Sequence, residues 1–342
     1  MSRAPDPTPP KRRGSKLDRH LGQLRRHGPR FFSGGFGSSA LLEQLQGRAH
    51  GIGIPELGAV RLIRQPEAGL HETWRGVVES PATLGPLPDV VRTLHFTLRL
   101  PANAKPGRTP MAVVVELVPL LGSLPTRLLT TRLVGEGVGS VVLEAPWHGA
   151  RLADAPGPGV THTVEDFVLM QRAAALEACA LAAWLLAQGH PRVVLTGYGL
   201  GGALAAHAAS VFPIPLAAAP LLAPESAAPV FFDGVLRSAA DLPALIREAG
   251  SEASARHRLE RALGGIALTS IEERRPAALF AARRDGWIPA ASTLRLAQQL
   301  AGAPVRTFPG GHVEAALRGT SAALATVEQA LGQLPELALN VE

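Results

Sequence analysis

Short runs of apolar residues recur from residue 91 onward and predict the strands of a buried sheet. In residues 91–100 apolar and polar positions alternate with a period of two, which leaves one face of that strand exposed to solvent. The later runs are continuously apolar, as a parallel sheet covered on both faces requires. These continuous strands are predicted over residues 111–115, 138–143, 192–196, 216–222, 277–282 and 305–308.

Stretches with helical spacing separate several of these strands. Residues 164–187 show the spacing most clearly, and residues 201–210, 291–300 and 321–331 are further predicted helices. Alternating strands and helices predict an α/β fold with a mostly parallel, doubly wound sheet and helices on both of its faces. Residues 225–275 interrupt the alternation with charged, helix-like sequence, so we place a small helical cap insertion there.

Charge divides the chain into two parts. Residues 1–30 carry nine Lys and Arg against two acids, whereas residues 31–342 are almost neutral. We therefore interpret residues 1–30 as a basic N-terminal extension and residues 31–342 as one domain, long enough to bury a large core. A solvated tail is the ordinary interpretation of such an arm, and contact with an anionic membrane surface is the functional alternative. No aromatic residues interleave with the basic ones, which argues against nucleic-acid binding.

Other features of the composition exclude several classes of protein. The single cysteine, Cys179, rules out a disulfide scaffold, and its apolar helical surroundings favour a buried filler over a nucleophile. No cluster of His, Cys and acids has zinc spacing, so we expect no metal and no other cofactor. The N-terminus lacks the apolar segment of a signal peptide, and the uncharged stretch 193–224 contains too many Gly and Pro for a membrane span. We expect a cytoplasmic protein whose basic arm is the candidate for peripheral membrane contact.

The most informative segment predicts a strand, a sharp turn and a small-residue helix over residues 193–204. Two motifs overlap in its turn, residues 197–202, which read Gly-Tyr-Gly-Leu-Gly-Gly. One is the G-x-S-x-G nucleophile elbow of hydrolases, with Gly199 where the serine would stand. The other is the G-x-G-x-x-G turn of dinucleotide sites, which usually follows the first strand of its domain and needs an acid at the end of the next one. Here at least three strands come earlier, and Glu225 lies outside the next apolar run.

A candidate acid and a candidate base come later in the chain. Asp285 follows the predicted strand 277–282, and His312 follows the predicted strand 305–308. Elbow, acid and histidine in this order is the chain order of the α/β-hydrolase triad, in which the histidine is the base and the acid orients it. Taken singly, Asp285 fits a turn cap and His312 a surface loop. Together with the elbow, they favour a hydrolase architecture.

The chain resembles the α/β-hydrolase domain-containing protein 18 family over nearly its whole length. The resemblance rests mainly on Asp285-Gly286-Trp287-Ile288-Pro289 and Gly310-Gly311-His312. Supporting segments are residues 15–18, 146–151, 197–202 and 230–236. The resemblance implies an α/β-hydrolase fold, a carboxylic ester hydrolase ancestry, and Asp285 and His312 at the family's acid and base positions.

Two departures from the family pattern fall on the chemistry. The family has serine where Gly199 stands, so this chain offers no hydroxyl to attack a carbonyl. The family also has a glycine-rich turn that helps to hold the oxyanion, where this chain has residues 116–123 with Pro119 and three leucines. Loss of a triad nucleophile lowers turnover by on the order of a million-fold. Glycine adopts positive φ without strain, so the elbow can persist after its chemistry has gone.

We therefore interpret the protein as a degenerate hydrolase that binds a lipophilic or ester-like small molecule, or a partner. Two alternatives stay open: an ester or lipid acyl hydrolase with an altered mechanism that uses His312 and Asp285, and dinucleotide binding at residues 197–202. Ser123 and Thr196 are candidate replacement nucleophiles, although neither stands on a projecting elbow. The residues expected to line the pocket flank Gly199 or follow strand ends: Trp147, His148, Tyr198, Leu200 and Trp287. His148 is also a candidate replacement base.

Overall fold

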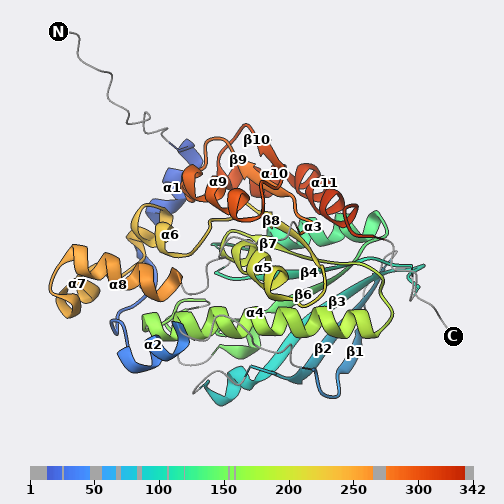
Figure 1. Cartoon of the computed structure of the whole chain (residues 1–342), viewed down its shortest axis with the longest axis horizontal. Coiled ribbons are helices and arrows are strands. Elements are labelled where there is room, and N and C mark those ends of the chain that lie inside the picture. Colours follow the sequence, from blue (N-terminus) through green and yellow to red (C-terminus); the bar gives the residue numbers. More distant parts are fainter. Residues whose placement is uncertain are drawn as a thin grey trace, which may run out of the picture.

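A sheet of nine strands runs through the described part of the chain in the order β1-β2-β3-β6-β4-β7-β8-β9-β10 (Figure 1). The computed structural model describes residues 14–24, 27–46, 56–66, 71–82, 87–105, 108–118, 120–152, 155–157, 159–264 and 275–335. The strands are β1 (Arg61–Gln65), β2 (His71–Glu79), β3 (Thr93–Pro101), β4 (Met111–Glu116), β6 (Gly139–Glu144), β7 (Val193–Tyr198), β8 (Ala217–Leu221), β9 (Leu279–Ala282) and β10 (Val305–Phe308). A short strand, β5 (Leu120–Ser123), lies outside this order.

The strand directions follow the hydrophobic pattern. From β6 through β4, β7, β8 and β9 to β10 all neighbours are parallel, and these strands come from the continuous apolar runs. The first three strands are antiparallel to one another, and β3 is also antiparallel to β6. On β3 the alternating residues Leu94, Phe96 and Leu98 are buried. The predicted α/β fold with a mostly parallel sheet is therefore confirmed.

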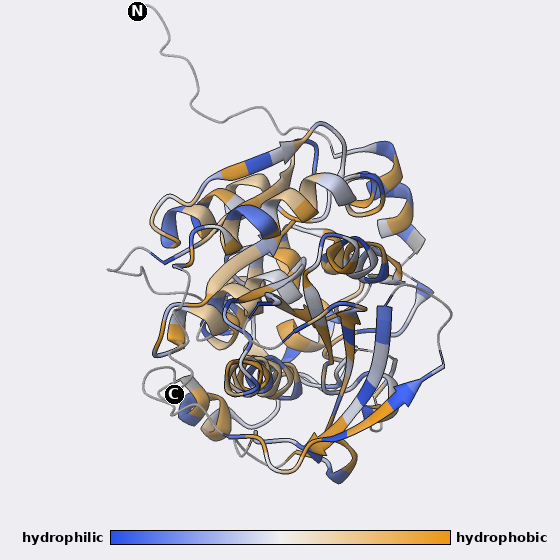
Figure 2. Cartoon of the chain, turned by 90° about the vertical axis from the view of Figure 1, so that its right-hand side faces the viewer, coloured by the Kyte–Doolittle hydropathy of each residue, from blue (hydrophilic) through white to orange (hydrophobic). Residues whose placement is uncertain are grey.

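Helices cover both faces of the sheet, and β4 shows how its residues divide between them. Val113 and Val115 pack in the core with α4 (Val164–Ala187) and α5 (Leu200–Val211). Ala112 and Val114 point the other way and pack with the second group of helices. That group comprises α3 (Leu124–Gly135), α10 (His312–Arg318) and α11 (Thr320–Leu331). Figure 2 shows the hydrophobic strands inside the molecule with helices to either side.

The long helix α4 lies alongside the sheet (Figure 1). It begins with a capping box, in which Thr163 and Asp166 each bond the other's backbone N–H. In length and composition α4 could cross a membrane, but 83% of its most apolar window is buried inside the protein, as in the core helix of a globular fold. Its Glu177 forms a fully buried ion pair with Arg151 at 2.5 Å, which ties the segment after β6 to this helix.

The segment expected as a cap, residues 225–275, is mainly helical in its described part. It contains α6 (Ala228–Phe232), η4 (Val235–Ser238), α7 (Leu242–Ala249) and α8 (Glu252–Gly264), and residues 265–274 lie outside the described residues. The helices α7 and α8 lie at one end of the molecule (Figure 1). Four aromatic rings, Phe31, Phe32, Phe167 and Phe231, pack together and join the N-terminal region, α4 and α6.

The interpretation of residues 1–30 as a solvated arm is wrong for its folded part. Residues 16–24 form helix α1 (Lys16–Leu24), and a second short helix, α2 (Ser39–Gln46), follows. Ser15 and Asp18 are buried, since one face of α1 packs on the loops after β9 and β10. The net positive charge of the segment hid this face, because the basic residues of α1 point to solvent. Residues 1–13 lie outside the described residues.

Candidate functional site

The strand order places a pocket at the carboxyl ends of the central parallel strands. From β4 the chain continues toward β6 on one side, whereas from β7 it continues toward β8 on the other. Ligands of open α/β sheets bind in the crevice at such a reversal. Here a pocket of about 70 Å³, hereafter the central pocket, lies beside Gly199 at the end of β7. Its walls are mainly apolar and include Leu117, Val118, Val230, Leu236, Ile288 and Ala316.

The turn between β7 and α5 has the backbone of a nucleophile elbow. Gly199 has φ 57° and ψ −125°, and its N–H donates to the Leu221 carbonyl oxygen at 2.9 Å. A Cβ added to Gly197 or Gly201 would collide with the Val115 carbonyl oxygen, so these two glycines permit the close approach of β7, α5 and β4. A Cβ added to Gly199 would meet no atom within 4 Å. The position is shaped for a projecting side chain that glycine does not supply.

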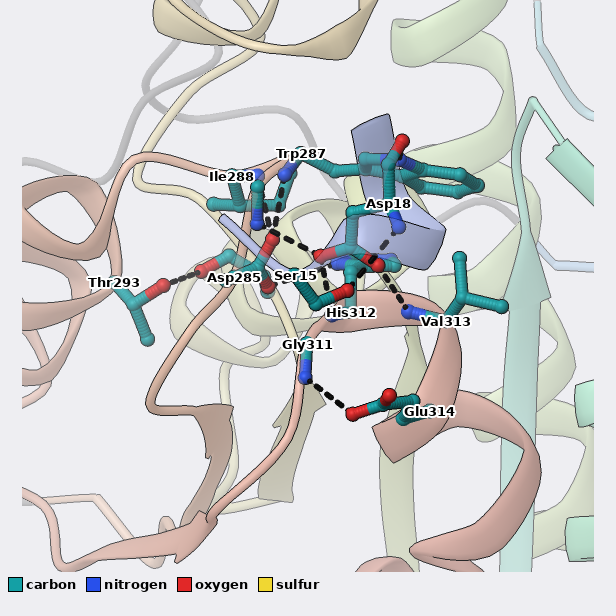
Figure 3. Close-up of polar contacts among 12 residues, drawn as sticks. Ser15, Asp18, Asp285, Trp287, Ile288, Thr293, Gly311, His312, Val313 and Glu314 are labelled. Carbon is teal, nitrogen blue, oxygen red and sulfur yellow. Dashed lines mark hydrogen bonds and ion pairs between the residues drawn. The ribbon is translucent and has the colours of Figure 1, made fainter. Parts of the chain in front are cut away.

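Asp285 and His312, which follow β9 and β10, lie against each other (Figure 3). His312 Nδ1 donates to Asp285 Oδ2 at 2.9 Å. The other carboxylate oxygen of Asp285 accepts the N–H groups of Trp287 and Ile288, each at 2.8 Å, and these bonds fix the carboxylate. The Trp287 ring stacks on the imidazole at 4.8 Å between centroids and 25° between planes. His312 therefore has a fixed orientation, and it lines the pocket together with Gly199.

The surroundings of His312 raise its pKa. Burial acts against the charged imidazole and lowers the pKa, but the charge and the hydrogen bond of Asp285, with a further contribution from the charge of Asp18, outweigh it. The histidine begins α10 and is buried, so it does not lie in the surface loop of the ordinary interpretation. Asp285 acts on His312 as the acid of a triad does, by holding one ring nitrogen and stabilising the protonated ring.

Two sets of comparisons bear on this arrangement. A sequence model of the family described as alpha/beta hydrolase domain containing 18 matches residues 30–267. The chain belongs to this family. Acetyl xylan esterase from Paenibacillus sp. R4 is similar in structure, with a TM-score of 0.56 and 16% identity over 88% of this chain and 99% of that one. Acetyl xylan esterase 1 from Thermoanaerobacterium sp. JW/SL YS485 is also similar, with a TM-score of 0.58 and 13% identity over 90% of this chain and 98% of that one.

A third similar structure is a CE15 glucuronoyl esterase from Teredinibacter turnerae T7901, with a TM-score of 0.50 and 15% identity over 86% of this chain and 83% of that one. At these identities the likeness concerns the fold alone. Together with the family match, it shows that the chain has the α/β-hydrolase fold.

The buried carboxylate of Asp18, on the N-terminal helix, holds the backbone around the Asp285–His312 pair of this α/β-hydrolase domain. Its Oδ2 accepts the N–H groups of Gly286 and His312 at 2.8 Å each, and its Oδ1 accepts that of Val313 at 3.0 Å (Figure 3). Trp287 Nε1–H donates to the Asp18 carbonyl oxygen at 2.9 Å. The sequence reasoning did not assign Asp18 to the site. The available signal was its position in a family segment and the inward face that it shares with Ser15.

The loop after β4 differs from the glycine-rich turn that the family resemblance implies. Glu116 ends β4, and its carboxylate accepts the hydroxyl protons of Ser123 at 2.9 Å and Thr126 at 2.8 Å. Val118 has a φ of 53°, and Pro119 lies outside the described residues. Glu116 lines the central pocket. A negatively charged acceptor therefore stands on the loop that holds backbone donors for the oxyanion in α/β-hydrolases.

The candidate replacement nucleophiles are held by other bonds. The Ser123 hydroxyl donates to Glu116, and the buried Thr196 hydroxyl donates to the Ala219 carbonyl oxygen at 2.7 Å. Cys179 is buried on α4, where burial raises the pKa of its thiol to about 12. A neutral thiol at that depth is a poor nucleophile. None of the three is among the described residues that line the central pocket.

The five residues expected to line the pocket divide into two groups. Tyr198, Leu200 and Trp287 do line it. The buried Tyr198 hydroxyl has no hydrogen-bond partner among the described residues, and burial raises its pKa. Trp147 and His148 are buried but are not among the described residues of the central pocket. His148 instead lines a separate cavity of about 390 Å³, hereafter the polar cavity.

His148 is poorly placed to replace the base. Its Nδ1 donates to the Pro146 carbonyl oxygen at 2.8 Å. Burial lowers its pKa more than the hydrogen bond to Pro146 and the charge of Glu144 raise it, which favours the neutral ring. His148 lines the polar cavity, whereas Gly199 of the elbow lines the central pocket. A pocket-wall role fits this position.

Proposed function

We propose that this protein is a non-catalytic member of its family that binds a small lipophilic molecule in the central pocket. The observation that carries the proposal is the elbow at Gly199, which keeps the backbone that presents a nucleophile and lacks the side chain. The pocket beside it keeps mainly apolar walls. Binding uses these walls, whereas acyl transfer needs a nucleophile.

Loss of the nucleophile raises the activation free energy of ester hydrolysis by a large amount. Removing a triad nucleophile lowers turnover by on the order of a million-fold, and much of the activity that remains comes from the oxyanion hole and substrate binding. Here the oxyanion contribution is opposed as well, because an acidic residue, Glu116, is part of the wall of the pocket in which negative charge would develop. Ser123 and Thr196 donate their hydroxyl protons elsewhere, which supports the same conclusion.

A second candidate function is slow ester hydrolysis by a water molecule. It is favoured by one observation, the 2.9 Å bond between His312 and Asp285. In this alternative His312 Nε2 accepts a proton from water held in the open space at Gly199, and the resulting hydroxide attacks the ester carbonyl. The reaction would proceed without an acyl-enzyme and would depend wholly on His312.

Dinucleotide binding at residues 197–202 receives no such support. Gly197 and Gly201 are required by the approach of the Val115 carbonyl oxygen, so packing within the sheet accounts for them. Their presence therefore needs no phosphate group.

Binding and turnover measurements distinguish the two candidate functions. We expect hexan-1-ol to bind the protein at one saturable site, measured by calorimetry. Leu121→Trp fills the central pocket and should weaken binding at least about tenfold. Leu294→Trp changes a side chain that is 58% exposed and outside the pocket, and should leave binding unchanged.

In parallel, hydrolysis of p-nitrophenyl butyrate by the native protein should equal that of His312→Ala. A rate that falls to background in His312→Ala would establish the second candidate function. Hexanol binding that is not saturable, or that survives in Leu121→Trp, would refute the proposed one.

A further inference from the structure

Charge is distributed unevenly around the central pocket. Among its described lining residues there is no Lys or Arg, and the only groups that can carry charge at neutral pH are Glu116 and His312. Any positive charge on His312 is matched by Asp285 at 2.9 Å, and Asp18 adds a second carboxylate beside the ring's backbone. The pocket therefore offers an electronegative environment to whatever binds in it.

Glu116 lines this pocket, and its carboxylate is fixed as a hydrogen-bond acceptor. Its two carboxylate oxygens take hydroxyl protons from Ser123 and Thr126, which orient the carboxylate and leave further lone pairs free. The carboxylate has no ion-pair partner among the described residues. It also separates the apolar pocket from the polar cavity, because Glu116 and Thr126 line both.

A second polar residue belongs to the same pocket. Tyr198 lines the central pocket, and its buried hydroxyl has no hydrogen-bond partner among the described residues. A buried hydroxyl without a partner is costly, and a ligand with a polar head would satisfy it. Glu116 and Tyr198 stand at the ends of β4 and β7, which pair in parallel in the sheet. Together they present one anionic acceptor and one hydroxyl.

We propose that the ligand of the central pocket is an apolar chain whose head is a hydrogen-bond donor, an alcohol or an ammonium group, and that Glu116 rejects carboxylates. The inference rests on the proposed function, since it assigns the chemistry of the ligand at that site. A donor head donates a hydrogen bond to the Glu116 carboxylate while the apolar chain lies along the apolar walls. A carboxylate head meets a like charge in a partly desolvated position, which is repulsive, and it offers Glu116 no proton for a further hydrogen bond.

A matched series of six-carbon probes tests the selectivity. Hexan-1-ol, hexylammonium and hexanoate share one chain and differ in the head, so calorimetry at pH 7 reports the head alone. We expect hexanol and hexylammonium to bind the native protein at least about tenfold more tightly than hexanoate. Glu116→Gln keeps the size and removes the charge. It should strengthen the binding of hexanoate and weaken the binding of hexylammonium, each by about tenfold, and should change the affinity for hexanol less than about threefold.

Two further variants complete the test. Glu136→Gln makes the same change in net charge at an exposed residue outside the pocket, and it should leave all three affinities unchanged. Glu116→Asp keeps the charge on a shorter side chain and should keep the preference for hexylammonium over hexanoate, which provides a test if Glu116→Gln does not fold.

The possible outcomes separate this inference from the proposed function. Hexanoate that binds the native protein as tightly as hexylammonium, or an unchanged ratio in Glu116→Gln, overturns the assignment of Glu116 while ligand binding stands. Saturable binding by none of the three probes overturns the proposed function, and this inference with it.

Discussion

At the scale of single residues, the glycines of the elbow occupy their positions for different physical reasons. Gly197 and Gly201 allow β7 and α5 to approach the Val115 carbonyl oxygen, so any side chain there would displace backbone. Gly199 has open space where a Cβ would be, and only its φ of 57° favours glycine. The fold therefore depends on the outer glycines, and the chemistry depends on what stands between them.

Alanine substitutions separate these two roles. Gly199→Ala should lower the free energy of unfolding by about 1–3 kcal/mol, the usual cost of a strained backbone conformation. Gly201→Ala should cost more than Gly199→Ala, about 3 kcal/mol, because the backbone must move. Urea denaturation followed by circular dichroism measures both. Equal costs at the two positions would mean that the space at Gly199 is not open.

The raised pKa of His312 has a consequence for stability. Below the ordinary pKa of about 6.5 the imidazole is protonated in the folded and unfolded states, and its bond to Asp285 stabilises the fold fully. As the pH rises through the higher folded pKa, the native state loses that proton and the stabilisation with it. The difference in free energy of unfolding between the native protein and Asp285→Asn should therefore be largest near pH 6 and shrink toward pH 9.

Urea unfolding at steps between these pH values measures that difference, and groups common to both proteins cancel. A difference that grows with rising pH would contradict the raised pKa.

At the scale of elements, the sequence predicts the buried parts of the sheet well. Residues 164–187 form α4 with the predicted bounds, and the predicted strands 111–115 and 192–196 lie within two residues of the bounds of the buried strands β4 and β7, because helical spacing and apolar runs report burial directly. The hydrophobic pattern predicts no strand at β2, which contains Gly76 in its interior. In the structure Gly76 pairs with Phe96 on β3, and the ring fills the space that a Cβ would need. The partner strand supplies what the local sequence lacks.

The contact between α1 and α10 belongs to the same scale. Asp18 accepts hydrogen bonds from three backbone N–H groups at the start of α10 and in the loop after β9. These bonds anchor the face of α1 that carries Asp18 to the site. Asp18→Asn replaces an acceptor oxygen with an N–H₂ group and should lower the free energy of unfolding by about 1–3 kcal/mol. It should also weaken hexanol binding, because His312 and Trp287 lose their support.

Asp89→Asn is the matched control, since that side chain is fully exposed. It should be neutral within about 0.5 kcal/mol. An Asp18→Asn variant with native stability and native hexanol affinity would show that α1 does not support the site.

At the scale of the whole molecule, the site brings together groups from distant parts of the chain. Asp18 bonds the backbone of His312 across 294 positions of sequence, and the elbow lies between them in the chain. Order along the chain was enough to pair Asp285 with His312, because both follow parallel strands whose carboxyl ends share an edge. Nothing local to residues 15–18 indicates which loops they will contact. The same holds for Glu116, whose position at the pocket depends on the packing of its loop.

The central claim is that the fold presents a nucleophile position without a nucleophile. A fluorophosphonate probe reacts covalently with an activated hydroxyl, and peptide mass spectrometry locates the adduct. We expect no adduct on any residue of the central pocket in the native protein. Gly199→Ser should carry one at position 199, which is lost when His312→Ala is added. An adduct on a residue of the central pocket in the native protein would contradict the claim.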